Sequence, residues 1–426
     1  MTKQPKIVII GAGFGGIAMV KSFKNKPVSV LLIDQHNYHN FQPLMYQVAT
    51  GGLEPGSIAY PIRRIFRNYK NVNFRMAEVF SMSSEEKTLS TSAGTIAFDY
   101  LIIATGSQNN FFNFEPVKDK LLTLKSIPDA LNLRSFIFQN LEKAMEDNKS
   151  EPLDEILNIA IVGGGPAGIE LAGALAEMKR YVIPKDFPGL DISKMNINLY
   201  EAAPKLLAVM SKNASEKSEI YLKELGINVF LNAKVNSYDE GIITLADNTT
   251  FKTDTVIWTA GVKGAPINGL SKDIIIGGNR ISVNEYNQVI GYNKIFAIGD
   301  VASHISEVNP KGLPMLAPVA QQQGVLLSKN IIRHFSGKPM ESFKYKDKGS
   351  MATVGRKKAV VDLPKWKFQG TFAWLVWMFI HIFSLVGFRN KFVAFIDWFS
   401  NYISYDRPLG LIIRPYKRAK ENKTNE

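Results

Sequence analysis

The chain has 426 residues and no cysteine, and this absence removes several classes of chemistry. Disulfides, thiolate metal sites, iron–sulfur ligation and redox-active dithiols all need the cysteine thiol. Histidine is also scarce: the five histidines are scattered and form no ligand cluster, so we expect no metal site. If the protein carries out redox chemistry, its electrons must move through a bound cofactor.

The sequence also lacks a secretory signal, because the apolar run after MTKQPK is too short for an h-region. We therefore expect the body of the protein in the cytoplasm. The formal net charge of +13 predicts an anionic partner, such as nucleic acid, a membrane surface or a charged ligand. No basic-aromatic module is evident, so we expect no nucleic-acid partner.

The stretch KIVIIGAGFGG, residues 6–16, predicts a buried strand that runs into a glycine turn. A helix over 17–23 and a second strand over 28–33 should follow. That strand ends at Asp34, where a dinucleotide-binding fold places the acceptor for a ribose hydroxyl. Glycine turns also occur for packing alone, and an acid at a strand end is often simply solvated. The turn glycines are Gly11, Gly13 and Gly16.

The same pattern returns at residues 158–170, NIAIVGGGPAGIE, before a predicted strand over 196–200 that ends at Glu201. Both copies close on a similar strand, LIIATG at 101–106 and TVIWTAG at 255–261. Such repetition indicates an internal duplication. Backbone N–H groups and a helix dipole at each turn favour a pyrophosphate, so two dinucleotides are implied. The second set of glycines is Gly163, Gly165 and Gly168.

Three further features refine the hypothesis. Glu201 should accept hydrogen bonds from a ribose diol and repel a 2′-phosphate, so the second copy favours NADH over NADPH. Asp300 ends a strand over 294–300, KIFAIGD, at the sheet edge where open α/β folds bind ligands, although such an acid can also be a turn former. Residues 36–53 are rich in aromatic and amide side chains, and a loop of that length is often functional.

Seven motifs together resemble the two-dinucleotide-binding flavoproteins and, within them, the type II NADH:quinone oxidoreductases, which are non-proton-pumping NADH dehydrogenases. The motifs are GAGFGG, NFQPLMYQVATGGL, LIIATGS, IVGGGPAGIELAG, FAIGD, APVAQQQG and GFRNK, and they span nearly the whole chain. The absence of cysteine fits, because dihydrolipoamide dehydrogenases, sulfide:quinone reductases and NADH peroxidases need redox-active thiols.

This resemblance implies an α/β fold with two Rossmann-like domains. The NADH-binding domain, residues 120–262, is inserted into a discontinuous FAD-binding domain, residues 1–119 and 263–340. Residues 341–426 then form an amphipathic helical region that anchors the protein to a membrane.

The resemblance also implies which residues bind non-covalent FAD and NADH. Glu170, just inside the second helix, should lie near the nicotinamide and flavin and link hydride transfer to proton delivery. The implied FAD residues are Gly11, Ala12, Gly13, Phe14, Gly15, Gly16, Asp34, Val79, Thr105, Gly106, Asp300 and Ala320. The implied NADH residues are Gly163, Gly165, Gly168 and Glu201.

The quinone site is where the sequence departs from the family. The usual AQxxxQ motif is altered, because Pro318 follows Ala317 and leaves only Gln322 in register, with Gln323 beside it. We expect these glutamines and Lys391 to contact the quinone. The alternatives are a helix that begins at Pro318 with glutamines on its polar face, and a lysine that snorkels toward lipid headgroups.

The C-terminal fifth contains two apolar stretches. Residues 368–388 carry no Asp, Glu, Lys or Arg and are long enough for a transmembrane helix. Residues 389–405 instead show an amphipathic pattern, with Phe392, Phe395, Ile396, Phe399 and Ile403 opposite Asp397, Ser400 and Asn401. We expect a monotopic helical pair, with a single span or a dimer interface as alternatives. The cations that would attract anionic lipids are Arg389, Lys391, Arg407, Arg414, Lys417, Arg418 and Lys420.

The expected reaction passes hydride from NADH to flavin N5 and then two electrons to a membrane quinone, ubiquinone or menaquinone, without proton pumping. We expect a homodimer attached peripherally to the cytoplasmic face of the inner membrane. Two other functions remain open. One is a soluble FAD/NADH reductase of the ferredoxin-reductase type with another acceptor, and the other is a membrane-bound flavin redox sensor with negligible turnover.

Overall fold

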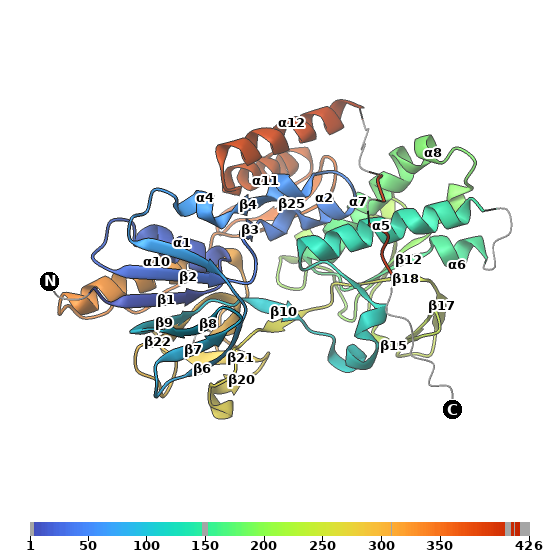
Figure 1. The fold of residues 1–426 in the computed structure, drawn as a ribbon. Coiled ribbons are helices and arrows are strands. Elements are labelled where there is room, and N and C mark those ends of the chain that lie inside the picture. The colour runs from blue at the N-terminus through green and yellow to red at the C-terminus, as the bar shows by residue number, and fades with distance from the viewer. Residues whose placement is uncertain (1–3, 147–151, 308, 405–409, 413, 418–426) are drawn as a thin grey trace. The chain divides into compact units, whose positions relative to one another are not determined.

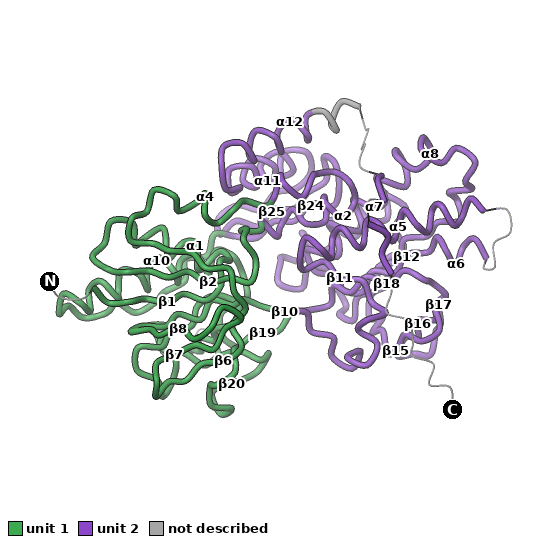
Figure 2. The backbone as a smooth tube through the Cα atoms, viewed as in Figure 1, with its two compact units in different colours: residues 1–40, 59–108, 262–348 green, residues 41–58, 109–261, 349–426 purple. Residues whose placement is uncertain are grey.

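The computed structural model describes residues 4–146, 152–307, 309–404, 410–412 and 414–417. The chain forms two compact units (Figure 2). The first comprises residues 1–40, 59–108 and 262–348, and the second comprises residues 41–58, 109–261 and 349–426. Both units are discontinuous in sequence, and residues 41–58, expected in the first domain, fall in the second unit. Within the second unit, α2 (Met45–Ala49) and β24 (Ser350–Gly355) both contact the helix α7 (Pro166–Tyr181).

The first unit is built on five parallel strands in the order β22-β9-β1-β2-β5, and Figure 1 labels the first four of them. Both faces of the sheet are covered, which explains the continuous apolar sequence of β1 (Lys6–Ile10). Ile7 and Ile9 pack toward α1 and α10, while Val8 and Ile10 pack toward smaller antiparallel strands. The other four strands are β2 (Ser29–Asp34), β5 (Val72–Met76), β9 (Tyr100–Ile103) and β22 (Ile295–Ala297).

Helices α1 (Phe14–Ser22) and α10 (Ala317–Phe335) pack closely against each other. A Cβ atom at Gly324 would lie 2.5 Å from the Gly15 carbonyl oxygen, so this approach requires glycine at position 324. The smaller elements of the unit are β3 (Tyr38–Asn40), β4 (Ala59–Pro61), α4 (Ile62–Phe66), β6 (Val79–Ser83), β7 (Thr88–Thr91), β8 (Gly94–Ala97), β20 (Ile275–Ile276), β21 (Arg280–Val283) and β23 (Ala302–His304). The chain passes from one unit to the other at strands β10 (Ser107–Asn109) and β19 (Val262–Gly264).

The second unit repeats this plan with five parallel strands in the order β11-β18-β12-β13-β14. Strand β12 (Ile159–Val162) takes the central place and leads through the second glycine turn into α7. The remaining strands of the sheet are β11 (Leu122–Thr123), β13 (Ile197–Tyr200), β14 (Asn228–Phe230) and β18 (Thr255–Trp258). The other elements are α5 (Ile127–Ala144), α6 (Leu153–Leu157), α8 (Ile183–Asp186), α9 (Lys212–Glu224), β15 (Val235–Asp239), β16 (Ile242–Leu245) and β17 (Thr250–Lys252).

The second unit also contains elements that the sequence did not predict. The expected loop 36–53 includes a short helix, α2 (Met45–Ala49), and α3 (Pro55–Ile58) follows it. An antiparallel sheet then fills part of the segment expected to be helical, with strands β24 (Ser350–Gly355), β25 (Lys358–Asp362) and β26 (Lys367–Gln369). β24 carries adjacent buried side chains from Ala352 to Val354, so it lacks the alternation that identifies a half-exposed strand.

The C-terminal apolar region forms two helices, α11 (Thr371–Ser384) and α12 (Phe388–Ser404). Gly387, with a φ of 88°, lies in the break between them. The 14 residues of α11 span about 21 Å, which is less than the thickness of a bilayer core. Among the described residues, no helix combines the length and apolarity that a membrane crossing needs. Three residues of the predicted amphipathic pattern, Ser400, Asn401 and Ile403, have side chains that the structure does not describe.

The contact between α7 and β24 gives a first prediction. A Cβ at Gly173 would overlap the Val354 carbonyl oxygen, so Gly173→Ala should reduce the free energy of unfolding by about 1–3 kcal/mol. Gly277→Ala is the control, because its added Cβ meets nothing within 4 Å, and it should change that energy by less than about 0.5 kcal/mol. Denaturant melts followed by circular dichroism measure both. Equal effects of the two substitutions would contradict the proposed packing constraint.

Candidate functional site

In the first glycine turn, two glycines are required by close backbone contacts, whereas the third faces open space. Gly11 has a φ of 104°, and a Cβ there would overlap the Ala104 carbonyl oxygen. A Cβ at Gly16 would overlap the carbonyl oxygen of Gly11 itself. At Gly13, by contrast, an added Cβ meets nothing within 4 Å. The turn therefore leaves a bare backbone face at the N-terminus of α1, which fits a pyrophosphate.

The second turn has the same division. Gly163 has a φ of 117°, and its added Cβ would lie 2.7 Å from the Cα of Ala260. A Cβ at Gly168 would overlap the Gly163 carbonyl oxygen, whereas at Gly165 it would meet nothing within 4 Å. Each unit thus presents its own bare helix N-terminus, and the residues present fit two dinucleotides.

The two predicted ribose acids are held in matching positions. Asp34 Oδ2 accepts a hydrogen bond from the Ala12 N–H at 2.7 Å, and Glu201 Oε2 accepts one from the Gly164 N–H at 2.6 Å. In each case the other carboxylate oxygen accepts from a backbone N–H two residues further along the chain, at 2.8 Å and 2.7 Å. Each acid is therefore fixed beside its turn, and a carboxylate oxygen has further acceptor capacity for a ribose hydroxyl.

Other predicted FAD residues gather near the first turn. Asp300 Oδ2 accepts a hydrogen bond from the Ser107 hydroxyl at 2.6 Å. Ala320, in the first turn of α10, approaches both Gly15 and the Gly299 that precedes Asp300. The remaining predicted residues of this unit lie on neighbouring elements: Phe14 at the start of α1, Thr105 and Gly106 after β9, and Val79 at the start of β6.

The two predicted quinone glutamines have protein partners within the first unit. Gln322 exchanges two hydrogen bonds with the backbone of Lys346, at 2.9 and 3.0 Å. Gln323 is buried, donates to Asn287 Oδ1 at 2.9 Å and accepts from the Gly299 N–H at 2.7 Å. Pro318 lies in the first turn of α10, as the structural alternative required. The quinone role of both glutamines stays a prediction.

Lys391 also has local partners. Its ammonium donates to the Phe383 carbonyl oxygen at 2.7 Å and lies 5.4 Å from the centre of the Phe383 ring. The lysine therefore satisfies a carbonyl in the last turn of α11, where a cation is favourable. Its contact with quinone stays a prediction.

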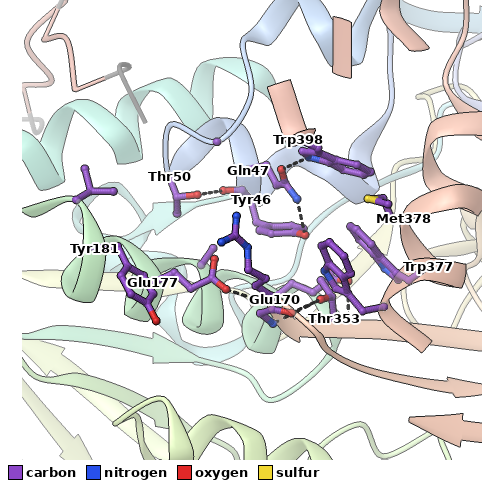
Figure 3. Close-up of a pocket in the computed structure, with 16 residues that line it drawn as sticks. Tyr46, Gln47, Thr50, Glu170, Glu177, Tyr181, Thr353, Trp377, Met378 and Trp398 are labelled. Atoms are coloured by element: carbon purple, nitrogen blue, oxygen red, sulfur yellow. Dashed lines mark hydrogen bonds between the residues drawn. The ribbon is translucent and has the colours of Figure 1, made fainter. Parts of the chain in front are cut away.

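Glu170 lines a pocket of about 90 Å³ that lies wholly within the second unit (Figure 3). The walls come from α2, α7, the turn after β24, α11 and α12. Burial raises the pKa of Glu170 to about 8, and the nearby Thr353 N–H and Trp377 indole lower it only in part. Thr353 donates its N–H to Glu170 Oε1 at a long 3.4 Å. At neutral pH this carboxyl group therefore holds a proton that it can donate.

Aromatic and amide side chains form the wall opposite Glu170 (Figure 3). The Trp398 indole N–H donates to Gln47 Oε1 at 2.6 Å, and Gln47 Nε2 donates to the Tyr46 hydroxyl at 2.9 Å. The rings of Trp377 and Trp398 lie 5.6 Å apart. This chain of contacts links α12 to α2. Sequence reasoning missed these individual residues, although the aromatic and amide-rich stretch 36–53 signalled a functional segment.

His381, a half-buried residue of α11, lies beside Trp377, which lines the pocket. His381 stacks on Trp377 with ring centres 4.1 Å apart, and its Nδ1 lies 2.7 Å from the Trp377 carbonyl oxygen. Burial lowers the pKa of His381 to about 4, so the ring is neutral at pH 7 and adds no positive charge near Glu170.

Comparisons with known proteins match both the part of the chain that holds the two glycine turns and the C-terminal part that holds α11 and α12. The family model described as "Pyridine nucleotide-disulphide oxidoreductase" matches residues 5–324, and the "NDH2 C-terminal domain" matches residues 348–404. A type II NADH:quinone oxidoreductase of Mycobacterium tuberculosis is 32% identical over 425 residues, covering 95% of this chain and 90% of that protein. Its counterpart from Haemophilus influenzae is 31% identical over 389 residues, covering 84% of this chain and 86% of that protein.

A solved structure titled as NDH2 from Plasmodium falciparum in complex with NADH shares the fold. Its TM-score is 0.88 at 24% identity, and the match covers 97% of this chain and 100% of that chain. The predicted α/β fold with two Rossmann-like domains is confirmed.

The open faces of the two turns give a paired prediction. Gly13→Val should fill the first open face and weaken FAD binding about tenfold or more, which corresponds to losing about 1.4 kcal/mol of binding. Gly165→Val should keep the flavin but weaken NADH binding by a similar factor. Flavin absorbance and NADH titration measure the two effects. If Gly165→Val released the flavin while Gly13→Val did not, the assignment of the turns would be wrong.

Proposed function

Because the chain belongs to the type II NADH:quinone oxidoreductases, we propose that it oxidises NADH and reduces a membrane quinone through bound FAD, without pumping protons. The observation that carries this proposal is the helix α7. It begins at the second dinucleotide turn and, within its first two turns, carries the buried, proton-bearing Glu170. One element thus supports both a nucleotide site and a proton donor.

FAD, when bound, supplies the hydride acceptance and two-electron transfer that protein side chains cannot perform. The first turn and Asp34 would hold it without a covalent bond, and Asp300 would contact its ribityl chain. The second turn and Glu201 would hold NADH, with the carboxylate selecting a free ribose diol.

Glu170 accounts for the proton balance. The reaction NADH + H⁺ + quinone → NAD⁺ + quinol consumes one proton beyond the transferred hydride. Glu170 is 8% exposed and is protonated at neutral pH, so it can supply that proton in a site from which bulk water is largely excluded. We propose that it does so at the quinone-reducing step and is then reprotonated.

The surface of α11 and α12 supports a peripheral membrane location. Large apolar side chains remain exposed on these helices, namely Phe372, Leu375, Phe379, Phe383, Phe388, Phe392, Phe395 and Phe399. Such a surface suits the interfacial region of a bilayer. Arg389, at the start of α12, adds positive charge to this surface. Tyr416, which lies between Arg414 and Lys417 in the sequence, bonds instead to Gln139 of α5, and Arg407, Arg418 and Lys420 lie outside the described residues. We place the protein on the cytoplasmic face of the inner membrane, as a homodimer.

The same two helices offer a path for the quinone. Trp374 and Trp377 of α11 and Trp398 of α12 line the Glu170 pocket, so the elements that face lipid also form its wall. A planar quinone ring packs well against indoles. We propose that the quinone approaches between these helices, with Gln322, Gln323 and Lys391 as the further contacts that the family resemblance implies.

Steady-state oxidation of NADH by the purified flavoprotein tests this function. Absorbance of NADH should fall rapidly only when a ubiquinone or menaquinone analogue is present. A flavin that NADH reduces but quinone does not reoxidise would favour a redox sensor or a reductase with another acceptor. A protein purified without flavin would contradict the cofactor assignment.

Glu170→Gln tests the proton donor. The substitution should lower quinone-dependent turnover about 10²-fold while the flavin content stays unchanged, because the amide cannot donate a proton in the same way. Wild-type turnover should fall as the pH rises through about 8, since Glu170 then ionises, and the variant should lose this dependence. Glu216→Gln, at an exposed position of α9, is the matched control. Identical pH profiles for wild type and Glu170→Gln would exclude the role.

Vesicle flotation tests the membrane surface. Phe379→Glu combined with Phe392→Glu should weaken binding to anionic vesicles at least about 10²-fold, because each lost aromatic insertion costs about 1.5–3 kcal/mol. Ile220→Glu changes a similarly exposed apolar residue on α9 and should leave vesicle binding unchanged. If the double variant and Ile220→Glu lost vesicle binding equally, the cause would be a general charge effect, and the assignment of α11 and α12 as the membrane surface would be contradicted.

A further inference from the structure

We propose that Glu177 is the residue that returns protons to Glu170, by passing them from the aqueous surface through the pocket that both carboxyl groups line. This inference rests on the proposed reaction, in which Glu170 loses one proton in each turnover. Glu177 acts through Glu170 and does not contact the reacting atoms.

The two glutamates lie on one stripe of α7. Glu170, Ala174, Glu177 and Tyr181 follow the spacing i, i+4, i+7 and i+11, and all four line the same pocket (Figure 3). Seven residues of helix separate the two carboxylates by about 10 Å along the axis. The residue between them, Ala174, has the smallest side chain that is not hydrogen, so it leaves the space between the acids open. The pocket of about 90 Å³ has room for a few water molecules.

The other walls provide no equivalent proton carrier. The charged or titratable groups that face the pocket are Tyr46 from α2, Glu170, Glu177 and Tyr181 from α7, and Arg356 from the turn after β24. Phenols and guanidinium groups do not readily release protons near neutral pH. The groups from α11 and α12 are indoles and a thioether, and the stacked His381 behind Trp377 is neutral. Glu177 is thus the second carboxylate among the described lining residues.

Glu177 is also held at the boundary between pocket and solvent. Its side chain is half-buried, whereas Glu170 is buried. The Arg356 N–H donates to Glu177 Oε1, and a Cβ at Gly355, whose φ is 145°, would lie 3.0 Å from that same oxygen. The turn between β24 and β25 is therefore shaped around the carboxylate and fixes it at the pocket edge.

The proposed step moves protons only. A hydronium ion or water protonates the Glu177 carboxylate, a water in the pocket relays the proton, and the Glu170 carboxylate left after donation accepts it. One proton enters from solvent for each NADH oxidised, and no electron moves in this step.

Glu177→Gln should slow quinone-dependent turnover about tenfold and increase the solvent deuterium isotope effect, while NADH reduces the flavin at the wild-type rate. Glu177→Asp should retain most of the turnover, and millimolar acetate should partly restore Glu177→Gln. Ala174→Leu keeps both acids but fills the gap, so it should slow turnover in the same way. Glu216→Gln again serves as the control.

A second measurement does not depend on turnover. After a pH jump, the infrared band of the protonated Glu170 carboxyl, identified by its loss in Glu170→Gln, should appear more slowly in Glu177→Gln and Ala174→Leu. Wild-type rates in both variants would overturn the relay. Slowed turnover with an unchanged band rate, no acetate rescue and a lowered melting temperature would show that Glu177 only braces the turn. Wild-type protein without quinone turnover would refute the proposed function, and the band rate would still test the relay.

Discussion

Both dinucleotide-type domains depend on one close contact, in which the third glycine of each turn meets the carbonyl oxygen of the first. Any side chain at Gly16 or Gly168 would overlap the carbonyl oxygen of Gly11 or Gly163. This contact holds the first strand and the following helix close together. No side chain of the described residues then covers the backbone N–H groups at the helix N-terminus, beside the end of the sheet. Asp34 and Glu201, the predicted ribose acids, then bond to the same turns, so the predicted anion site and its predicted selectivity share one piece of backbone.

The second copy of this contact supports more than nucleotide binding. It fixes the start of α7, and Gly173 on the same helix lets β24 approach so closely that Thr353 reaches Glu170. The turn after β24 then encloses Glu177, while α11 and α12 close the pocket with indoles. The helix that begins at the second glycine turn therefore also carries Glu170 and lines one pocket with α11 and α12, the helices that expose large apolar side chains.

Much of this could be predicted from the sequence because the signals are local. The glycine turns, their acids and the strands that flank each turn all follow from short motifs that recur at matching positions. The amphipathic pattern after residue 388 likewise identified α12, and Gly387 explains why the apolar run does not continue as one helix.

The remaining features depend on tertiary contacts that no single stretch encodes. β24 and β25 are buried among helices and so lack an alternating pattern. The pocket joins Tyr46, Glu177 and Trp398 from distant parts of the chain. Gln322 and Gln323 look available in the sequence, but their amides bond to Lys346, Asn287 and Gly299 in the folded unit.

The central claim is that one chain couples NADH to a quinone through a single flavin and takes one proton from solvent. An anaerobic titration in weak buffer, with flavin absorbance and pH recorded together, tests it most directly. We predict that one equivalent of NADH bleaches the flavin, that one equivalent of quinone restores its absorbance, and that one proton disappears per cycle. A flavin that stays oxidised after NADH, or stays bleached after quinone, would contradict the claim.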